Sequence, residues 1–195
     1  MNAFISMALF ALVASITPGP VNIVGLGIGA SHGFRASQRH IFGASAGFVL
    51  LLLLIGLGLR EVLVAMPFLV VFAQWAGMLF LVYVAWKLAR DDGHLSMNED
   101  GKPPSVLLAA AMQWLNPKAW MAAIAGVALF VAHGDAALVL QFATIYFVVC
   151  YVSMACWAYA GAFLRRFLNN TAAIRAFNRV MALLLIGSAV SLLPY

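Results

Sequence analysis

The chain has 195 residues, of which 65% are hydrophobic and 9% are charged, and its mean hydropathy is +1.02. A soluble domain has about 45–50% apolar and about 25% charged residues, so the composition excludes an ordinary soluble enzyme and indicates a polytopic membrane protein. The formal charge of +5 would suit a nucleic-acid surface only if the basic residues formed one patch. They are instead divided among the connections between apolar segments, so nucleic acid is not an expected partner.

Six apolar segments reach the length needed to cross a bilayer, about 17–25 residues. In chain order they are 2–31, 41–59, 67–88, 105–132, 136–164 and 174–193. Little chain remains outside them for a separate catalytic domain. We therefore predict an all-α protein, 1–195, that forms a single transmembrane domain with six helices.

Lysine and arginine gather in alternate connections between these segments. The first, third and fifth connections hold two, three and four of them: Arg35 and Arg39; Lys87, Arg90 and Lys102; Arg165, Arg166, Arg175 and Arg179. The opposite connections hold only Arg60. The positive-inside rule then places these basic connections in the cytoplasm and both termini on the outer side of the membrane. Anionic membrane lipids are the expected partners of the excess charge.

The N-terminal segment allows a second interpretation. Leu12-Val13-Ala14 resembles the end of a cleaved signal peptide, but no lysine or arginine precedes it to form a positive n-region. We expect this segment to be the first span.

A polar linker at 91–104 divides the chain into halves, 1–90 and 105–195, of three spans each. An odd number of spans per half predicts two inverted repeats. The first span of each half is interrupted by proline, at Pro18 and Pro20 and at Pro117. Paired broken helices in inverted halves indicate the binding site of a transporter.

Each break is expected to expose backbone groups, because proline lacks an N–H and collides with the carbonyl four residues earlier. The released carbonyls of Ala14 and Ile16 suit an ammonium group, and the half-helix starting near Val21 suits a carboxylate. A proline kink repaired by neighbouring side chains is the alternative. The predicted substrate-binding residues are Thr17, Pro18, Gly19, Pro20, Asn22, Gln113, Asn116, Pro117 and Lys118.

Lys118 is the one charge well inside a predicted span, and such residues are usually functional. Three roles stay open: it binds a substrate carboxylate, it titrates during transport, or it snorkels to the surface. No aspartate or glutamate lies at mid-membrane depth. His32, His40, His133 and Asp135 are expected at the ends of spans, where they could gate a pathway.

Glycines recur every fourth residue at Gly25, Gly29 and Gly33, and again at Gly43 and Gly47. This spacing predicts close helix packing, with a moving interface as the alternative. The five tryptophans are expected mainly at the membrane interfaces.

Several motifs resemble the LysE/RhtB family of amino-acid exporters over the whole chain. They are Thr17-Pro18-Gly19-Pro20, Ser31-His32-Gly33-Phe34-Arg35, Trp75-Ala76-Gly77, Tyr83-Val84-Ala85-Trp86-Lys87 and Leu115-Asn116-Pro117-Lys118-Ala119. The Ser31–Arg35 corner and Cys156-Trp157-Ala158 are similar to the cysteine and O-acetylserine exporter branch. The resemblance implies a bacterial inner-membrane protein that exports amino acids in exchange for protons. Unlike some lysine exporters, the segment 42–59 carries no acidic residue, so a small neutral substrate is expected.

Other classes fit the sequence less well. Cys150 and Cys156 lie six residues apart on one predicted helix, so their Cα atoms are about 9 Å apart, which is too far for a disulfide. A membrane redox protein of the thiol-relay type would need cysteines beside the proline breaks, and these two lie elsewhere. No HExxH motif or aspartate pair suggests an intramembrane hydrolase, and neither a metal nor a cofactor is expected. The prediction is a non-enzymatic transporter, with a passive channel as the alternative and a homodimer left open.

Overall fold

The computed structural model describes residues 3–59, 67–90, 105–131, 135–168 and 170–190, and every regular element within them is helical. The linker 91–104 and His133 lie outside the described residues. The elements are α1 Ala3–Ile16, α2 Pro20–His32, α3 Phe34–Leu54, η1 Ile55–Leu59, α5 Pro67–Ala89, α6 Val106–Trp114, α7 Pro117–Phe130, α8 Ala136–Leu164, η3 Arg165–Phe167 and α9 Thr171–Val190.

Each of the six predicted segments corresponds to one helix or to one broken pair of helices. The first segment is α1 and α2, which meet at a bend of 63°, and the fourth is α6 followed by α7. Among the described residues, three helical stretches are long and apolar enough to cross a membrane, Phe34–Gly58, Ala136–Phe167 and Thr171–Val190, and the bent pair makes a fourth when counted as one span. An all-helical polytopic membrane protein is confirmed, whereas the count of six spans and the inverted repeat stay predictions.

Polar residues and one glycine set the helix boundaries in this apolar chain. The Ser105 hydroxyl accepts a hydrogen bond from the Leu108 N–H at 3.1 Å, and the Asp135 carboxylate accepts one from the Ala137 N–H at 2.8 Å, so each caps the helix that it precedes. Gly33 joins α2 to α3 with φ of +81°, a conformation that glycine adopts without steric strain. The chain can therefore reverse direction within one residue.

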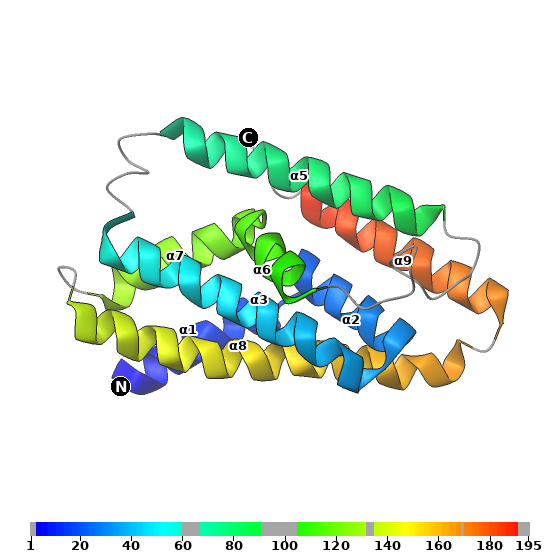
Figure 1. Cartoon of the computed structure of the whole chain (residues 1–195), viewed down its shortest axis with the longest axis horizontal. Coiled ribbons are helices and arrows are strands. Elements are labelled where there is room, and N and C mark those ends of the chain that lie inside the picture. Colours follow the sequence, from blue (N-terminus) through cyan, green and yellow to red (C-terminus); the bar gives the residue numbers. More distant parts are fainter. Residues whose placement is uncertain (1–2, 60–66, 91–104, 132–134, 169, 191–195) are drawn as a thin grey trace.

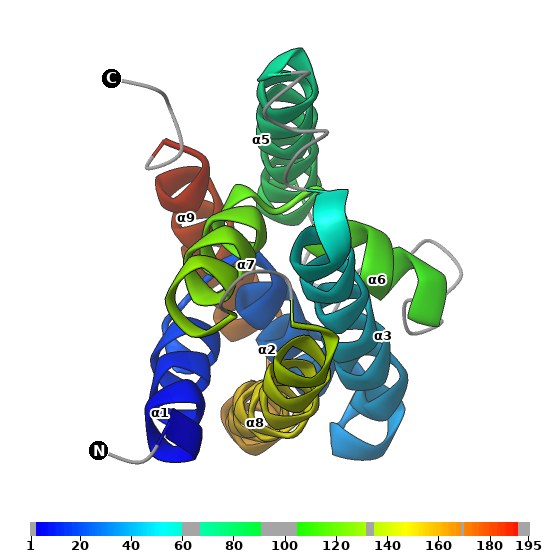
Figure 2. The same ribbon diagram turned by 90° about the vertical axis from the view of Figure 1, so that its left-hand side faces the viewer.

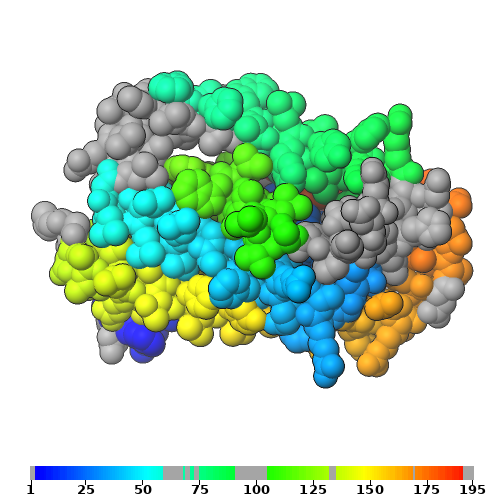
Figure 3. All heavy atoms as spheres, in the orientation of Figure 1, coloured from blue at the N-terminus to red at the C-terminus, as the bar shows by residue number. Residues whose placement is uncertain are grey.

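Helix α8 is the central element of the bundle, since it packs along α1, α2 and α3 (Figures 1 and 2). Helix α3 also packs against α6, whose atoms lie directly against it in Figure 3, and α5 packs against α9. These pairings all join the first half of the chain to the second. They are the contacts expected of two halves that are related by a twofold axis.

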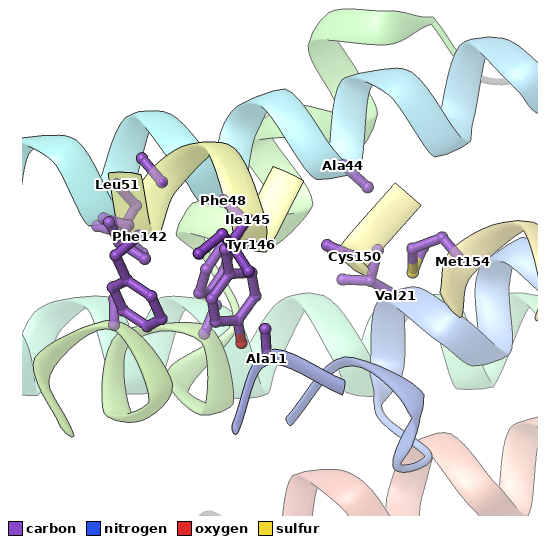
Figure 4. Close-up of a cluster of buried hydrophobic side chains, with 14 of the residues drawn as sticks. Ala11, Val21, Ala44, Phe48, Leu51, Phe142, Ile145, Tyr146, Cys150 and Met154 are labelled. Atoms are coloured by element: carbon purple, nitrogen blue, oxygen red, sulfur yellow. The ribbon is translucent and has the colours of Figure 1, made fainter. Parts of the chain in front are cut away.

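Large side chains fill the space between α3 and α8. The rings of Phe48 and Tyr146 stack with their centroids 4.2 Å apart, and Phe142 meets Tyr146 edge-on at 5.6 Å (Figure 4). Such pairs add to the stabilisation that burial provides. This aromatic layer fixes the distance between the two helices beside the site described below.

Two glycines pack α2 against α8 in a reciprocal way. A Cβ on Gly29 would overlap the carbonyl oxygen of Ala158, and a Cβ on Gly161 would overlap the carbonyl oxygen of Leu26. Backbone therefore lies directly against backbone, as small residues permit between membrane helices.

The predicted glycines of the second span lie against α6. A Cβ on Gly43 would overlap the Val106 carbonyl, and one on Gly47 would stand 2.6 Å from the Ala110 Cα. Gly25 instead faces a histidine ring, which is described below.

The described parts of the three basic connections lie at one end of the bundle. The α2–α3 junction, the end of α5 and the α8–α9 junction all appear at the right of Figure 1. The Arg165 guanidinium lies 3.6 Å from the position of a Gly33 Cβ, which places two of these connections side by side. Between the ends, many large apolar side chains point outward, including Phe72, Leu79 and Leu183 with 70%, 63% and 69% of their surface exposed. This surface suits hydrocarbon rather than water.

Candidate functional site

The two proline breaks lie against each other. The Lys118 Nζ donates hydrogen bonds to the carbonyl oxygen and to the Oγ1 of Thr17, each at 2.7 Å, across 101 residues of sequence. A Cβ on Gly19 would stand 3.4 Å from both the Cδ and the Nζ of Lys118. The lysine of the second break is thus held against the backbone of the first.

In the first break α1 ends at Ile16 and α2 begins at Pro20, which is suited to the first helical position because its missing N–H is not needed there. The amide of Asn22 reaches back across the break and donates to the Ser15 carbonyl at 2.8 Å. Asn22 is buried, so this bond satisfies a carbonyl whose partner within the helix is lost where α1 ends.

The prediction that the prolines leave free carbonyls is wrong in this structure. The Thr17 hydroxyl lies 2.9 Å from the Val13 carbonyl oxygen and 3.3 Å from that of Ala14. The indole N–H of Trp157 donates to the Ile16 carbonyl at 3.0 Å. Protein donors thus already occupy the carbonyls that were expected to bind an ammonium group.

At the second break, too, side chains pair with the backbone groups where one helix ends and the next begins. Helix α6 ends at Trp114 and α7 begins at Pro117, with Asn116 as the capping residue, because its side-chain oxygen accepts the Lys118 N–H at 3.2 Å. The Asn116 amide group donates to the Gln113 side-chain oxygen at 3.5 Å, and the Asn116 N–H donates to the Gln113 carbonyl at 3.1 Å. The two buried amide side chains are therefore fixed relative to the lysine.

Tryptophans hold the breaks, a role that the interface prediction misses. Besides the bond from Trp157, the Trp114 indole donates to the Gly47 carbonyl at 3.1 Å and the Trp120 indole donates to the Trp114 carbonyl at 2.7 Å. The only signal in the sequence is that Trp114 and Trp120 each lie three residues from Pro117.

A cavity lies where the two breaks face α8. Its polar side comes from both breaks and consists of Ser15, Asn22, Gln113, Asn116 and Lys118. Its opposite side comes from α3 and α8 and consists of Phe48, Tyr146, Cys150 and Met154. The cavity measures about 30 Å³, room for about two water molecules. Small-molecule sites enclose about 300–1,000 Å³, so this cavity is too small to admit an amino acid, and we call this state closed in that sense.

The predicted residues divide into three groups. Asn22, Gln113, Asn116 and Lys118 line the cavity, and Thr17 and Gly19 contact Lys118. The prolines lie outside the lining: Pro18 is exposed, whereas Pro20 and Pro117 are buried at the starts of α2 and α7. They shape the site rather than face it.

The side of the cavity from α3 and α8 was missed from the sequence. Tyr146, Cys150 and Met154 recur at every fourth position and so share one face of α8, but this spacing is also typical of an ordinary helix core. The cysteines are free, with Cys150 buried and Cys156 exposed. Ser15 also lines the cavity, and its hydroxyl has no hydrogen-bond partner among the described residues. An unpaired buried hydroxyl costs about 1–3 kcal/mol, unless a water or a bound ligand forms a hydrogen bond with it.

Of the polar residues expected at the ends of spans, two lie at helix ends and one lies in the interior. Asp135 caps α8, and the half-buried His32 lies at the end of α2. His40 is fully buried, because α3 begins at Phe34 rather than near Ile41 and the histidine falls in its second turn. The prediction for His40 is therefore corrected.

Comparison with known proteins agrees with this architecture. Residues 12–195 match the family model described as LysE type translocator. The chain is 34% identical to a cysteine/O-acetylserine efflux protein of Escherichia coli O139:H28 and 33% identical to the proteins of that name from E. coli K12 and Shigella sonnei. Each match spans 186 residues, 93% of this chain and 92% of the relative. No solved structure is significantly similar. With nearly its whole length matched, the chain belongs to the LysE family of membrane translocators.

Proposed function

We propose that this protein exports small neutral amino acids or their derivatives across the bacterial inner membrane, in exchange for protons and by alternating access. The carrying observation is the pair of hydrogen bonds from Lys118 to Thr17, which joins the two breaks at a buried polar cavity. Relatives named as cysteine/O-acetylserine efflux proteins support a substrate of the size of O-acetylserine, cysteine, homoserine or threonine.

The same pair of groups can bind both charges of an amino acid. A substrate carboxylate is a stronger partner for the Lys118 ammonium than the neutral oxygens of Thr17, because both members of the new pair are charged. When the lysine turns to the carboxylate, the Thr17 carbonyl and hydroxyl become available to the substrate ammonium. One zwitterion thus replaces one internal contact without leaving a buried charge unpaired.

The rest of the cavity favours a neutral side chain. Within the described part of the chain, its lining includes one cation, Lys118, and no carboxylate. A basic substrate would bring a second positive charge to this place, where burial makes an unpaired charge costly. The opposite wall, with Cys150 and Met154 between aromatic rings, suits a small polarisable group.

The closed cavity implies that transport includes an opening step. At about 30 Å³ it must widen before an amino acid enters, and the Lys118–Thr17 contact lies at its edge. The basic connections at one end of the bundle support an orientation with that end in the cytoplasm and both termini in the periplasm.

The test is transport by the purified full chain in proteoliposomes. Vesicles are loaded with labelled O-acetylserine, and efflux is measured with and without unlabelled substrate outside; cysteine, threonine and lysine are then compared. Exporter behaviour requires that outside substrate accelerates labelled efflux and that a pH gradient drives accumulation. A passive channel, the alternative, would release label at the same rate in both conditions. No release above protein-free vesicles would refute both functions.

A further inference from the structure

His40 combines full burial with an unused nitrogen. Its side chain is 0% exposed, and its Nε2 lies 3.2 Å from the carbonyl oxygen of Val21 on α2. A carbonyl only accepts hydrogen bonds, so Nε2 carries the hydrogen of the neutral ring and Nδ1 keeps its lone pair. Nδ1 has no hydrogen-bond partner among the described residues. An acceptor of this kind calls for an explanation, since buried polar groups are nearly always paired.

Among the residues that the structure describes, the groups found around the ring come from three helices, and none of them is charged. Helix α2 contributes the Val21 carbonyl and Gly25, α8 contributes Met154, and one turn earlier on α3 the Ser37 hydroxyl donates to the Gly33 carbonyl at 2.9 Å. A proton bound at Nδ1 would therefore meet no anion there. It would leave an imidazolium with one of its two N–H groups unpaired, which is unfavourable in a dry interior.

The ring lies next to the cavity wall. A Cβ on Gly25 would stand 3.5 Å from the His40 Cδ2 and Nε2 and 3.8 Å from the Met154 Cε, and Met154 lines the cavity. Val21 precedes Asn22, whose amide spans the first break. Figure 4 shows Val21, Cys150 and Met154 close together between α2, α3 and α8. Movement at the break that opens the cavity would thus also move the groups that keep His40 dry.

We propose that His40 carries the exchanged proton, an inference that rests on the export function proposed above. When the site is open to the periplasm, water reaches the ring and Nδ1 binds a proton from it. When the site is open to the cytoplasm, the imidazolium returns that proton to water and the neutral ring is restored. The closed structure favours the neutral ring, because Nδ1–H would have no partner there, so we assign this structure to the half of the cycle in which His40 is deprotonated; in the other half Nδ1–H must keep a water partner. One proton moves inward for each net-neutral amino acid that moves outward.

The test uses His40→Gln in the reconstituted full chain, with O-acetyl-L-serine as the probe. The glutamine amide can still donate to the Val21 carbonyl but cannot bind a proton between about pH 5 and 8. We expect H40Q to retain substrate exchange, to lose accumulation driven by a pH gradient and to lose the pH dependence of exchange. His32→Gln is the matched control, because His32 lies at the end of α2, where its Nδ1 is 3.1 Å from the Ser31 Oγ, and it should keep all three properties.

The outcomes separate the two proposals. Wild-type protein without exchange would refute the export function, and this inference with it. If the wild type accumulates substrate and H40Q does so equally with the same pH profile, only the role of His40 is overturned. If H40Q does not fold, substrate-linked proton uptake or release is measured on the wild type and on H32Q in weakly buffered detergent solution, with the imidazole ring followed by NMR. Titration of the His40 ring with the proton count supports the inference, and an unchanged His40 signal refutes it.

Discussion

The Nζ of Lys118 lies 2.7 Å from both the carbonyl oxygen and the hydroxyl of Thr17, so one side chain of α7 closes the gap between α1 and α2. This contact makes Lys118 more than a charge near the membrane surface. Of the three roles open from the sequence, binding of a substrate carboxylate is the one that this contact supports, because the ammonium group is directed at the broken helix.

Lys118→Met should reduce the transport efficiency for neutral amino acids by about 10- to 100-fold. The estimate follows from losing a hydrogen bond to a charged group, about 1.5–3 kcal/mol. Initial rates of counterflow in proteoliposomes would measure it. Lys87→Met, at the end of α5, is the matched control and should transport like the wild type. Equal rates for K118M and the wild type would remove Lys118 from the site.

Trp157→Phe should lower the stability of the protein by about 1–3 kcal/mol, because the Ile16 carbonyl loses its donor where hydrocarbon offers no replacement. Thermal unfolding in mild detergent would report the change. Trp86→Phe is the comparison, since the exposed Trp86 ring contacts the Arg90 guanidinium at 4.5 Å rather than a backbone carbonyl. A similar shift for both variants would contradict a specific role for Trp157.

Gly29→Ala should destabilise the fold by about 1–3 kcal/mol, since the added methyl group would overlap the Ala158 carbonyl and neither backbone can yield without moving a helix. Gly187→Ala on α9 is the matched control. A Cβ there meets nothing within 4 Å among the described residues, and alanine favours the helix by about 0.5–1 kcal/mol. Unfolding temperatures of the two variants should therefore move in opposite directions. A stable G29A would disprove the backbone contact between α2 and α8.

Cys150→Leu should block transport, because the larger side chain would fill a cavity of about 30 Å³. Cys150→Ala should preserve transport and admit somewhat larger substrates. Cys156→Leu is the control, since Cys156 is exposed on the same helix and is not part of the cavity lining. Competition of unlabelled amino acids with labelled O-acetylserine would measure selectivity. If C150L and C156L behave alike, the α8 side of the cavity does not contact substrate.

The sequence was most informative where physical rules act over short distances. Proline cannot continue a helix that precedes it, although it can begin a new one, so the breaks at residues 18, 20 and 117 could be predicted. That they lie together and share Lys118 depends on contacts across 101 residues, which the inverted-repeat argument anticipated only through symmetry. The identity of the donors could not be read from the chain. Trp157 is far from Ile16 in sequence. A tryptophan in an apolar segment can equally well lie at the lipid interface or donate its indole N–H to a backbone carbonyl inside the protein.

His40 illustrates a different limit. Hydropathy predicts an apolar segment that begins at Ile41, with His40 at the end of the span. The helix begins at Phe34 and turns His40 inward while Arg35 and Arg39 stay exposed. Hydropathy locates a span along the chain, but it does not tell which face of its first turns is buried.

The glycine contacts also bear on which helices can move. Where Gly29 meets Ala158 and Gly43 meets Val106, main chain rests on main chain, with no flexible side chain between them to absorb sliding. We expect α2 and α8 to move together as one rigid unit throughout the transport cycle, and α3 and α6 to move together as another. Helix α1 contains no glycine, and Gly126 of α7 rests on the ring edges of Phe10 and Phe142, which can rotate. Gly77 of α5 meets the Leu115 carbonyl just before α7, which holds the start of that half-helix, so the moving element would be α1, whose end Lys118 joins to α7.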